Sequence, residues 1–290
     1  MHQSYHKADL ILLAVTLIAA TGWIFTREAL VGFKPLTFMG ARFLLAGIVL
    51  SLFALKPLRL LTTRQLRNAL YAGGLFSFSM VLWIEGIYHS RYLGVGAFIF
   101  SLGVLLTPVL AWFFKDKPAM RVWAALPIAG IGLYLLSAGG DFEFGIGEYL
   151  FIASAISIAL YINVTTRVVS KVPPLPLTTI QLITVGAVLL SLAYFFEGIN
   201  WPNDTVIWSW FAASVLLATS LRFLLQIWAH GLAPASHTAV FLTLEPVWVA
   251  ILASLWLDEQ MSVLQLTGSA LIFISILLTR LPALVELVRR

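Results

Sequence analysis

The chain has 290 residues, of which 60% are hydrophobic and only 11% are charged. A soluble domain carries about 25% charged residues, so this composition excludes an ordinary soluble protein. There is no cysteine, which excludes disulfide and thiolate chemistry. No motif indicates a metal site or a cofactor.

Apolar runs recur along the whole chain and predict an all-α integral membrane protein with ten transmembrane helices. Runs of roughly 18–22 residues can each cross the hydrocarbon core of a bilayer, and a helix satisfies its own backbone hydrogen bonds there. Proline or glycine marks many of the short loops between the runs. The predicted helices cover residues 9–26, 36–55, 69–88, 94–114, 120–137, 146–166, 175–196, 207–229, 237–257 and 262–280.

Basic residues predict the orientation of these helices. Met1–Lys7 is short and polar, and no cleavage motif follows the first apolar run, so we expect that helix to be retained. Thirteen lysines and arginines fall on the side of the amino terminus and three on the other side, while Arg42 and Arg222 lie inside helices. The positive-inside rule therefore places both termini in the cytoplasm.

The second half of the chain repeats the first. Residues 9–55 align without a gap on residues 148–194, an offset of 139, and residues 84–137 align on residues 226–279, an offset of 142. We expect one unit of five helices over 1–139 and another over 140–290. Because five is odd, the two units insert in opposite orientations, which is typical of alternating-access transporters.

Two stretches resemble the EamA-type transporters of the drug/metabolite transporter superfamily. Pro35–Gly47 opens the second helix, and Leu244-Glu245-Pro246-Val247 leads through Leu257-Asp258-Glu259-Gln260 to Gly268. The first half departs from this pattern, since Gly103 and Val104 occupy the places of Glu245 and Pro246. The resemblance implies a ten-helix exporter of metabolites or drugs in the bacterial inner membrane, with an arginine at position 42.

Two ionisable residues are predicted to meet near the membrane midplane. Arg222 lies on the most polar stripe of its helix, with Gln226 one turn further on. Glu245 lies midway along the next helix, which a short turn makes an antiparallel neighbour. Charges inside a membrane are commonly functional, so Arg222 would bind an anionic group of a substrate, while Glu245 would bind a cation or carry a coupling proton. The alternative is a structural ion pair.

Gating is predicted at Pro246, Arg42 and Glu85. Pro246 removes a backbone donor and should kink its helix beside Glu245. Arg42 and Glu85 lie near the outer ends of their helices and could form an outer gating pair. For Arg42 the alternatives are that it snorkels to the headgroups or that it faces inward, as the resemblance to the family motif implies. For Glu85 the alternative is solvation at the interface.

A group of aromatic and amide side chains is predicted to line a cavity that accepts flat or apolar solutes. Tyr161 and Asn163 lie late in the sixth helix, Trp23 lies late in the first, and Trp248 follows Glu245. The alternatives are ordinary helix packing, lipid contact and anchoring at the interface.

These features predict a secondary transporter that exports a small amphipathic organic compound, such as an amino acid or an amine-bearing metabolite, by proton coupling or by exchange. The expected partners are this substrate and the bilayer, without nucleic acid, and the oligomeric state is open. The alternatives are a channel, a lipid scramblase, and a carrier of nucleotide conjugates or lipid-linked compounds. An intramembrane enzyme is disfavoured because hydrolase and metalloprotease motifs are absent from the sequence.

Overall fold

The computed structural model describes residues 2–115, 120–137, 144–232 and 241–279, together with residues 281 and 285. Every regular element in this part of the chain is helical, as the sequence predicts. Seven helices are long and apolar enough to cross a membrane, and three shorter apolar helices cover Met120–Leu135, Glu245–Trp256 and Val263–Thr279 within the described residues. The chain is therefore a multi-pass membrane protein.

The helices follow the predicted apolar runs, with ends that extend beyond several of them. They are α1 (His2–Ala29), α2 (Pro35–Arg59), α3 (Thr63–His89), α4 (Leu93–Ala111), α5 (Met120–Ser137), α6 (Ile146–Val169), α7 (Pro174–Leu192), α8 (Thr205–Val215), α9 (Arg222–Leu232), α11 (Glu245–Trp256) and α12 (Val263–Thr279). A π-helical segment, Ala193–Glu197, extends α7.

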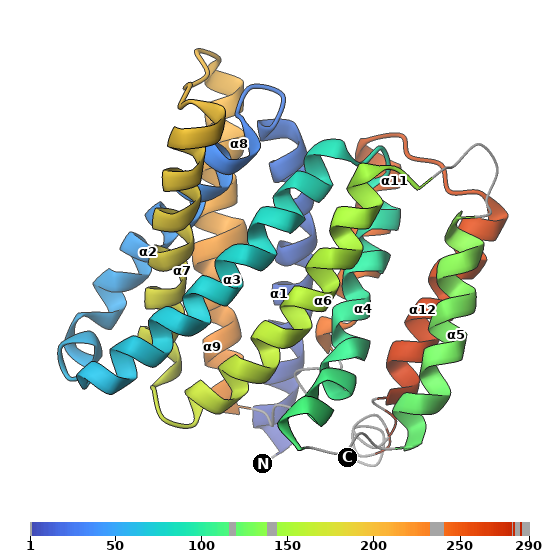
Figure 1. The fold of residues 1–290 in the computed structure, drawn as a ribbon, viewed down its shortest axis with the longest axis horizontal. Helices are drawn as coiled ribbons and strands as arrows, with labels where there is room; N and C mark the ends of the chain where they lie inside the picture. Colours follow the sequence, from blue (N-terminus) through green and yellow to red (C-terminus); the bar gives the residue numbers. More distant parts are fainter. Residues whose placement is uncertain are drawn as a thin grey trace.

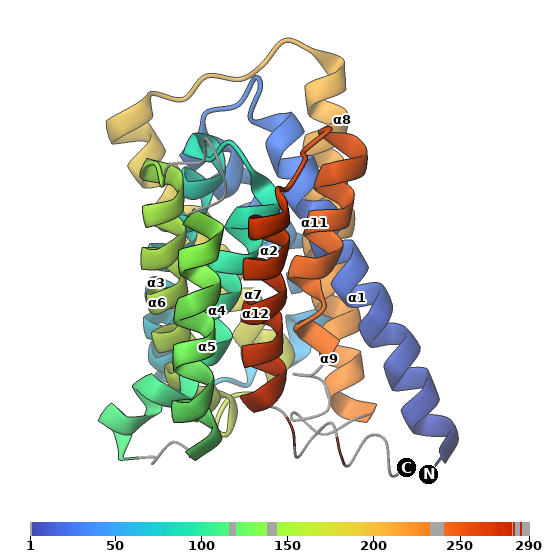
Figure 2. The same cartoon turned by 90° about the vertical axis from the view of Figure 1, so that its right-hand side faces the viewer.

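Helices at aligned positions of the two halves pack against each other. α2 packs along α7 at one edge of the bundle, and α5 packs along α12 at the opposite edge (Figures 1 and 2). Between these pairs, α3 and α4 of the first half contact α6 of the second half. The helices of the second half that align with α3 and α4 are α8, α9 and α11, and they contact α1 of the first half. The contacts of one half therefore have counterparts in the other.

The crossing of α2 and α7 depends on glycines at aligned positions. A Cβ atom on Gly186 would lie 2.4 Å from the backbone nitrogen of Leu44, and one on Gly47 would lie 3.0 Å from the backbone nitrogen of Ile183. Residue numbers rise along α2 as they fall along α7, so the two helices are antiparallel. Small residues permit this close approach of helices in a membrane.

Two predicted helices are interrupted. The helix predicted over 207–229 contains a π-helical segment, Leu216–Leu221, which joins α8 to α9 just before Arg222. The helix predicted over 237–257 begins within the described residues with a short helical stretch and a turn at 241–244, and α11 starts at Glu245. Pro246 lies in the first turn of α11 rather than at a kink inside a helix. Its missing N–H group costs little there. The change of direction beside Glu245 is therefore a turn between two helical stretches rather than a bend within one continuous helix.

The end of the bundle at which α1 finishes, here called the Ala29 end, is tied by carboxylates that cap helix N-termini. The backbone N–H groups of Leu93 and Gly94 donate to Glu259 over 2.8 and 3.1 Å. Those of Leu36 and Thr37 donate to Glu197 over 2.8 and 3.1 Å. These carboxylates satisfy donors that lack partners within their own helices. They join α4 to the loop between α11 and α12, and α2 to the end of the π-helical segment after α7.

Glu259 lies in the loop between α11 and α12 and is buried. Burial raises the pKa of its carboxyl group, while the N–H groups of Leu93 and Gly94 and the charge of Arg27 act in the opposite direction. Burial removes water from the carboxyl group and so disfavours its charged form. This effect is larger than the stabilisation of the charged form by the two N–H groups and Arg27. The pKa of Glu259 therefore lies above the ordinary value of a glutamate.

Candidate substrate cavity

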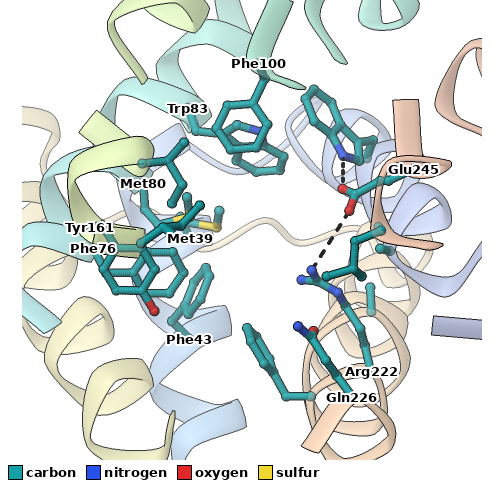
Figure 3. A pocket seen from close by; sticks show the side chains of 18 of the residues that line it. Met39, Phe43, Phe76, Met80, Trp83, Phe100, Tyr161, Arg222, Gln226 and Glu245 are labelled. Atoms are coloured by element: carbon teal, nitrogen blue, oxygen red, sulfur yellow. Dashed lines mark hydrogen bonds and ion pairs between the residues drawn. The ribbon is translucent and has the colours of Figure 1, made fainter. Parts of the chain in front are cut away.

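A cavity of about 410 Å³ lies in the middle of the bundle. Side chains from α1, α2, α3, α4, α6, α9 and the start of α11 line it. Its volume falls within the range of roughly 300–1,000 Å³ that is typical of small-molecule sites. Figure 3 shows charged and polar side chains on one side of the open space and aromatic and methionine side chains on the other.

The charged end of the cavity is built around Glu245. Its Oε1 atom accepts a hydrogen bond of 3.1 Å from the indole Nε1 of Trp23. Its Oε2 atom lies 3.9 Å from Nη2 of Arg222 (Figure 3). The sequence-predicted meeting of Arg222 and Glu245 is therefore observed. Both side chains are about one quarter exposed, at 24% and 23%, so the pair faces the cavity.

Two polar atoms at this end have no hydrogen-bond partner within the described structure. They are Nε of Arg222 and Oε1 of Gln226, and both atoms are buried. Gln226 follows Arg222 by one turn of α9, so both residues lie on the face that lines the cavity. Unpaired buried polar groups are costly, so the polar groups at this end of the cavity are not fully satisfied by the protein.

Arg42 contributes a second positive charge to the cavity wall. Its Nε donates to the hydroxyl of Thr219 over 2.7 Å, and its Nη1 donates to the hydroxyl of Thr26 over 2.8 Å. The side chain is 6% exposed, so it does not snorkel to the headgroups. Gly22 lies beside it and permits the close approach of Ala218, from which a Cβ atom on Gly22 would lie 2.9 Å.

The opposite end of the cavity is apolar and aromatic. The rings of Phe76 and Tyr161 stack with centroids 4.6 Å apart, and Phe43 meets Phe76 edge-on at 5.7 Å. Met39 and Met80 lie beside these rings (Figure 3). Thioethers adapt their shape and contact aromatic rings favourably, so this end offers a deformable apolar surface.

Two of the predicted cavity residues do not line it. Asn163 donates to the carbonyl oxygens of Thr107 and Ala159 over 2.8 and 2.9 Å, and so joins α6 to α4. Trp248 packs against the apolar core of the bundle, and its buried indole nitrogen has no partner in the described part. Trp23 and Tyr161 do line the cavity, as predicted.

The predicted outer gating pair of Arg42 and Glu85 is not formed. Glu85 lies 3.5 Å from His89, one turn along α3, whereas Arg42 points at two threonine hydroxyls. The prediction was wrong because helix ends at a similar depth need not face each other. The sequence did not predict Thr26 and Thr219 as partners of Arg42, because no sequence motif identifies a hydroxyl group that accepts from an arginine.

These features define a class of protein, namely a multi-pass membrane protein with a charged cavity inside its helical bundle. The model of the EamA-like transporter family matches residues 6–138 and again residues 145–281. The chain belongs to the EamA-like transporter family, within the drug/metabolite transporter superfamily. It is thus a membrane transporter, as the resemblance of its motifs implies.

Relatives from a bacterium and an archaeon agree with this family. The chain is 27% identical over 283 residues to the uncharacterized transporter YvbV of Bacillus subtilis, with 94% of this chain and 91% of the relative covered. It is 26% identical over 275 residues to an uncharacterized transporter of Archaeoglobus fulgidus, with 94% and 86% covered. A crystal structure described only as that of a protein has the same fold, with a TM-score of 0.68, 17% identity, and 96% of this chain and 98% of that chain covered.

Proposed function

We propose that this protein is a ten-span secondary carrier that exports a small amphipathic organic compound across the bacterial inner membrane. The charged cavity carries this proposal, because a carrier needs a polar site enclosed within its apolar helices. Amino acids and amine-bearing compounds are the first cargo to test. The three shorter apolar helices would complete the ten spans, with both termini in the cytoplasm.

An inverted repeat is supported by the contacts of α2 and α7. These helices occupy aligned positions in the two halves and pack antiparallel at reciprocal glycines. Two units of opposite orientation can exchange their conformations, so that the cavity opens alternately to each side of the membrane. The boundary between the units would lie near residue 139.

A state closed to the outside is supported by the hydrogen bonds of the Ala29 end. Nη1 of Arg27 donates to the carbonyl oxygens of Ile87 and Ser90 over 2.8 and 3.0 Å. Trp256 donates from its indole nitrogen to Glu28 over 3.0 Å. Together with the helix caps made by the loop carboxylates, these contacts would have to break before a cavity could open at that end.

Transport by purified protein tests this function. A thermal-shift screen against amino acids, nucleosides, polyamines and cationic drugs should find a ligand, because binding to the folded state raises its apparent stability. Flux of that ligand into proteoliposomes should then saturate with concentration. Flux that rises linearly, together with unitary currents in single-channel recordings, would instead indicate a channel.

Proton coupling is tested by Glu245→Gln in the same proteoliposomes. The amide keeps the size of the side chain and can still accept from Trp23, but it cannot carry a proton. We expect ligand exchange to persist and the response of transport to a pH gradient to disappear. Unchanged pH dependence with full activity would remove Glu245 from the coupling step.

A further inference from the structure

The ionisable side chains that line the cavity do not balance in charge. Arg42 and Arg222 face it from α2 and α9, and Glu245 faces it from the start of α11. Two arginines against one glutamate leave one positive charge in excess. A charge held away from water is costly unless an opposite charge compensates it, so the cavity favours an anion.

Glu245 is already committed to protein partners. One carboxylate oxygen accepts from Trp23 and the other faces Arg222. An amine of a substrate would have to compete with both of them for the same carboxylate. The wall therefore offers little negative charge to a cation.

The arginines retain capacity to bind an anion. Within the described residues no carboxylate lies within ion-pair distance of Arg42, whose partners are the neutral hydroxyls of Thr26 and Thr219. Nε of Arg222 has no partner at all there. The Arg222 side chain lines the cavity and is 24% exposed, and a guanidinium group can bind a carboxylate through two parallel hydrogen bonds.

The remainder of the cavity accepts an apolar body. The stacked rings of Phe76 and Tyr161, with Met39 and Met80, lie across the open space from Arg222 (Figure 3). A molecule with a carboxylate at one end and an aromatic or aliphatic group at the other would satisfy both ends at once. A small inorganic anion would leave the aromatic end without contacts.

We infer that the cargo is an amphipathic organic monoanion, whose carboxylate binds between Arg222 and Arg42 and whose apolar body packs on Phe76, Tyr161, Met39 and Met80. This inference rests on the proposed carrier function and narrows its cargo. It places acids and acylated amino acids ahead of free amines.

Three compounds with one aromatic body test the inference. They are 3-phenylpropionate, phenylalanine and phenethylamine, which carry net charges of about −1, 0 and +1 near neutral pH, as the ordinary pKa values of carboxyl and amino groups require. Isothermal titration calorimetry of the detergent-purified full chain should rank them in that order of affinity. A tighter or equal affinity for phenylalanine or phenethylamine, or no binding of 3-phenylpropionate, would overturn the inference.

Substitutions then locate the anion. Arg222→Gln and Arg42→Gln should each weaken binding of 3-phenylpropionate about ten- to hundredfold, as expected for hydrogen bonds to a charged group. Arg67→Gln removes an exposed arginine outside the cavity and should leave the affinity unchanged. Unaltered affinity in both cavity variants would overturn the assignment.

Glu245→Gln should increase the affinity for 3-phenylpropionate, which a misfolded variant would not do. Loss of the carboxylate frees Arg222 and raises the excess positive charge, so 3-phenylpropionate should bind more tightly. Weaker binding in this variant would contradict the inference. Transport separates the two proposals, because saturable flux of phenethylamine would overturn the charge preference and keep the carrier, whereas linear flux of every compound would overturn the carrier.

Discussion

The two halves of the molecule share one hydrogen-bonding arrangement but place different side chains in it. In the first half, Arg42 of α2 donates to the hydroxyl of Thr26 over 2.8 Å. At the aligned positions of the second half, Gln181 of α7 donates to the hydroxyl of Thr165 over 3.3 Å. The same contact is therefore charged in one half and neutral in the other.

A size difference accompanies this charge difference. Gly22 of the first half lies beside the guanidinium group of Arg42. The residue aligned with Gly22 is Tyr161, whose hydroxyl donates to Gln181 over 3.1 Å. The small Gly22 thus lies beside the long Arg42, whereas the large Tyr161 lies beside the shorter Gln181. Each half fills its space in this way.

The remaining charged residues of the cavity are divided the other way, because both lie in the second half. The offset of 142 pairs Glu245 with Gly103. Extended by four residues before the start of the aligned stretch, from 226 back to 222, it pairs Arg222 with Met80. Both Arg222 and Met80 line the cavity. The helix contacts of the two halves are thus similar, whereas the cavity has a charged end and an apolar end. Similar contacts allow the helices of the two halves to pack in the same way. Different side chains at aligned positions make one end of the cavity charged and the other apolar.

The largest expected effect comes from breaking the symmetric contact of α2 and α7. In Gly186→Ala the new Cβ atom would lie 2.4 Å from the backbone of Leu44, which cannot move without shifting the helix. Overpacking of this kind costs about 1–3 kcal/mol, and we expect a lower apparent melting temperature in detergent. Gly74→Ala is the control, because nothing lies within 4 Å of its new methyl group. An equal response of both variants would show that the crossing is not closely packed.

A smaller effect should come from a substitution in the second half, where the neutral Gln181 stands at the position aligned with Arg42. Tyr161→Phe removes the hydroxyl that donates to Gln181 but keeps the ring stacked on Phe76. We expect a loss of about 0.5–1.5 kcal/mol in stability and an unchanged order of affinity for the three charged and neutral ligands. Tyr149→Phe, at a side chain that is 62% exposed, serves as the control. A reversed order of affinity in Tyr161→Phe would show that the aromatic end of the cavity, rather than the arginine end, distinguishes the charges of the ligands.

The smallest effect concerns the loops at aligned ends of the two halves, where Glu259 corresponds to Lys117 in the sequence. Because burial raises the pKa of Glu259 in the folded state, the folded protein binds more protons than the unfolded chain between the ordinary and the raised pKa. Stability should therefore fall slightly as the pH rises through that window. Glu259→Gln should remove this slope in thermal-shift measurements made at several pH values.

Asp258→Asn is the matched control for this loop. Asp258 has a positive φ of 53°, which asparagine tolerates, and its side chain is exposed. The pH slope should persist in this variant. A slope that persists in Glu259→Gln as well would assign the proton to another group.

The parts of the fold that the sequence predicts are those with a periodic or repeated signal. Long apolar runs place the helices, and the constant offset identifies which helices correspond. The approach of Arg222 and Glu245 is also predictable, because both lie at similar distances from one short turn between neighbouring helices. These inferences need only local spacing and chain connectivity.

The errors involve contacts that connectivity does not determine. Proline at position 246 suits either a kink or a first helical turn, and only the interruption before Glu245 distinguishes them. Asn163 is polar and well placed along α6, yet its rotation about the helix axis turns it toward Thr107. Arg42 finds its hydroxyl partners on α1 and in the π-helical segment before α9, and no local pattern specifies them.

The two π-helical segments, Ala193–Glu197 and Leu216–Leu221, both lie in the second half. The internal offset grows from 139 to 142 across this same region, so the second half holds three additional residues there. A π turn accommodates one residue more than an α turn. Each widened turn can hold one of these residues while the rest of its helix keeps its facing. The winding of these helices thus lets the two halves differ in length while their aligned side chains keep corresponding positions.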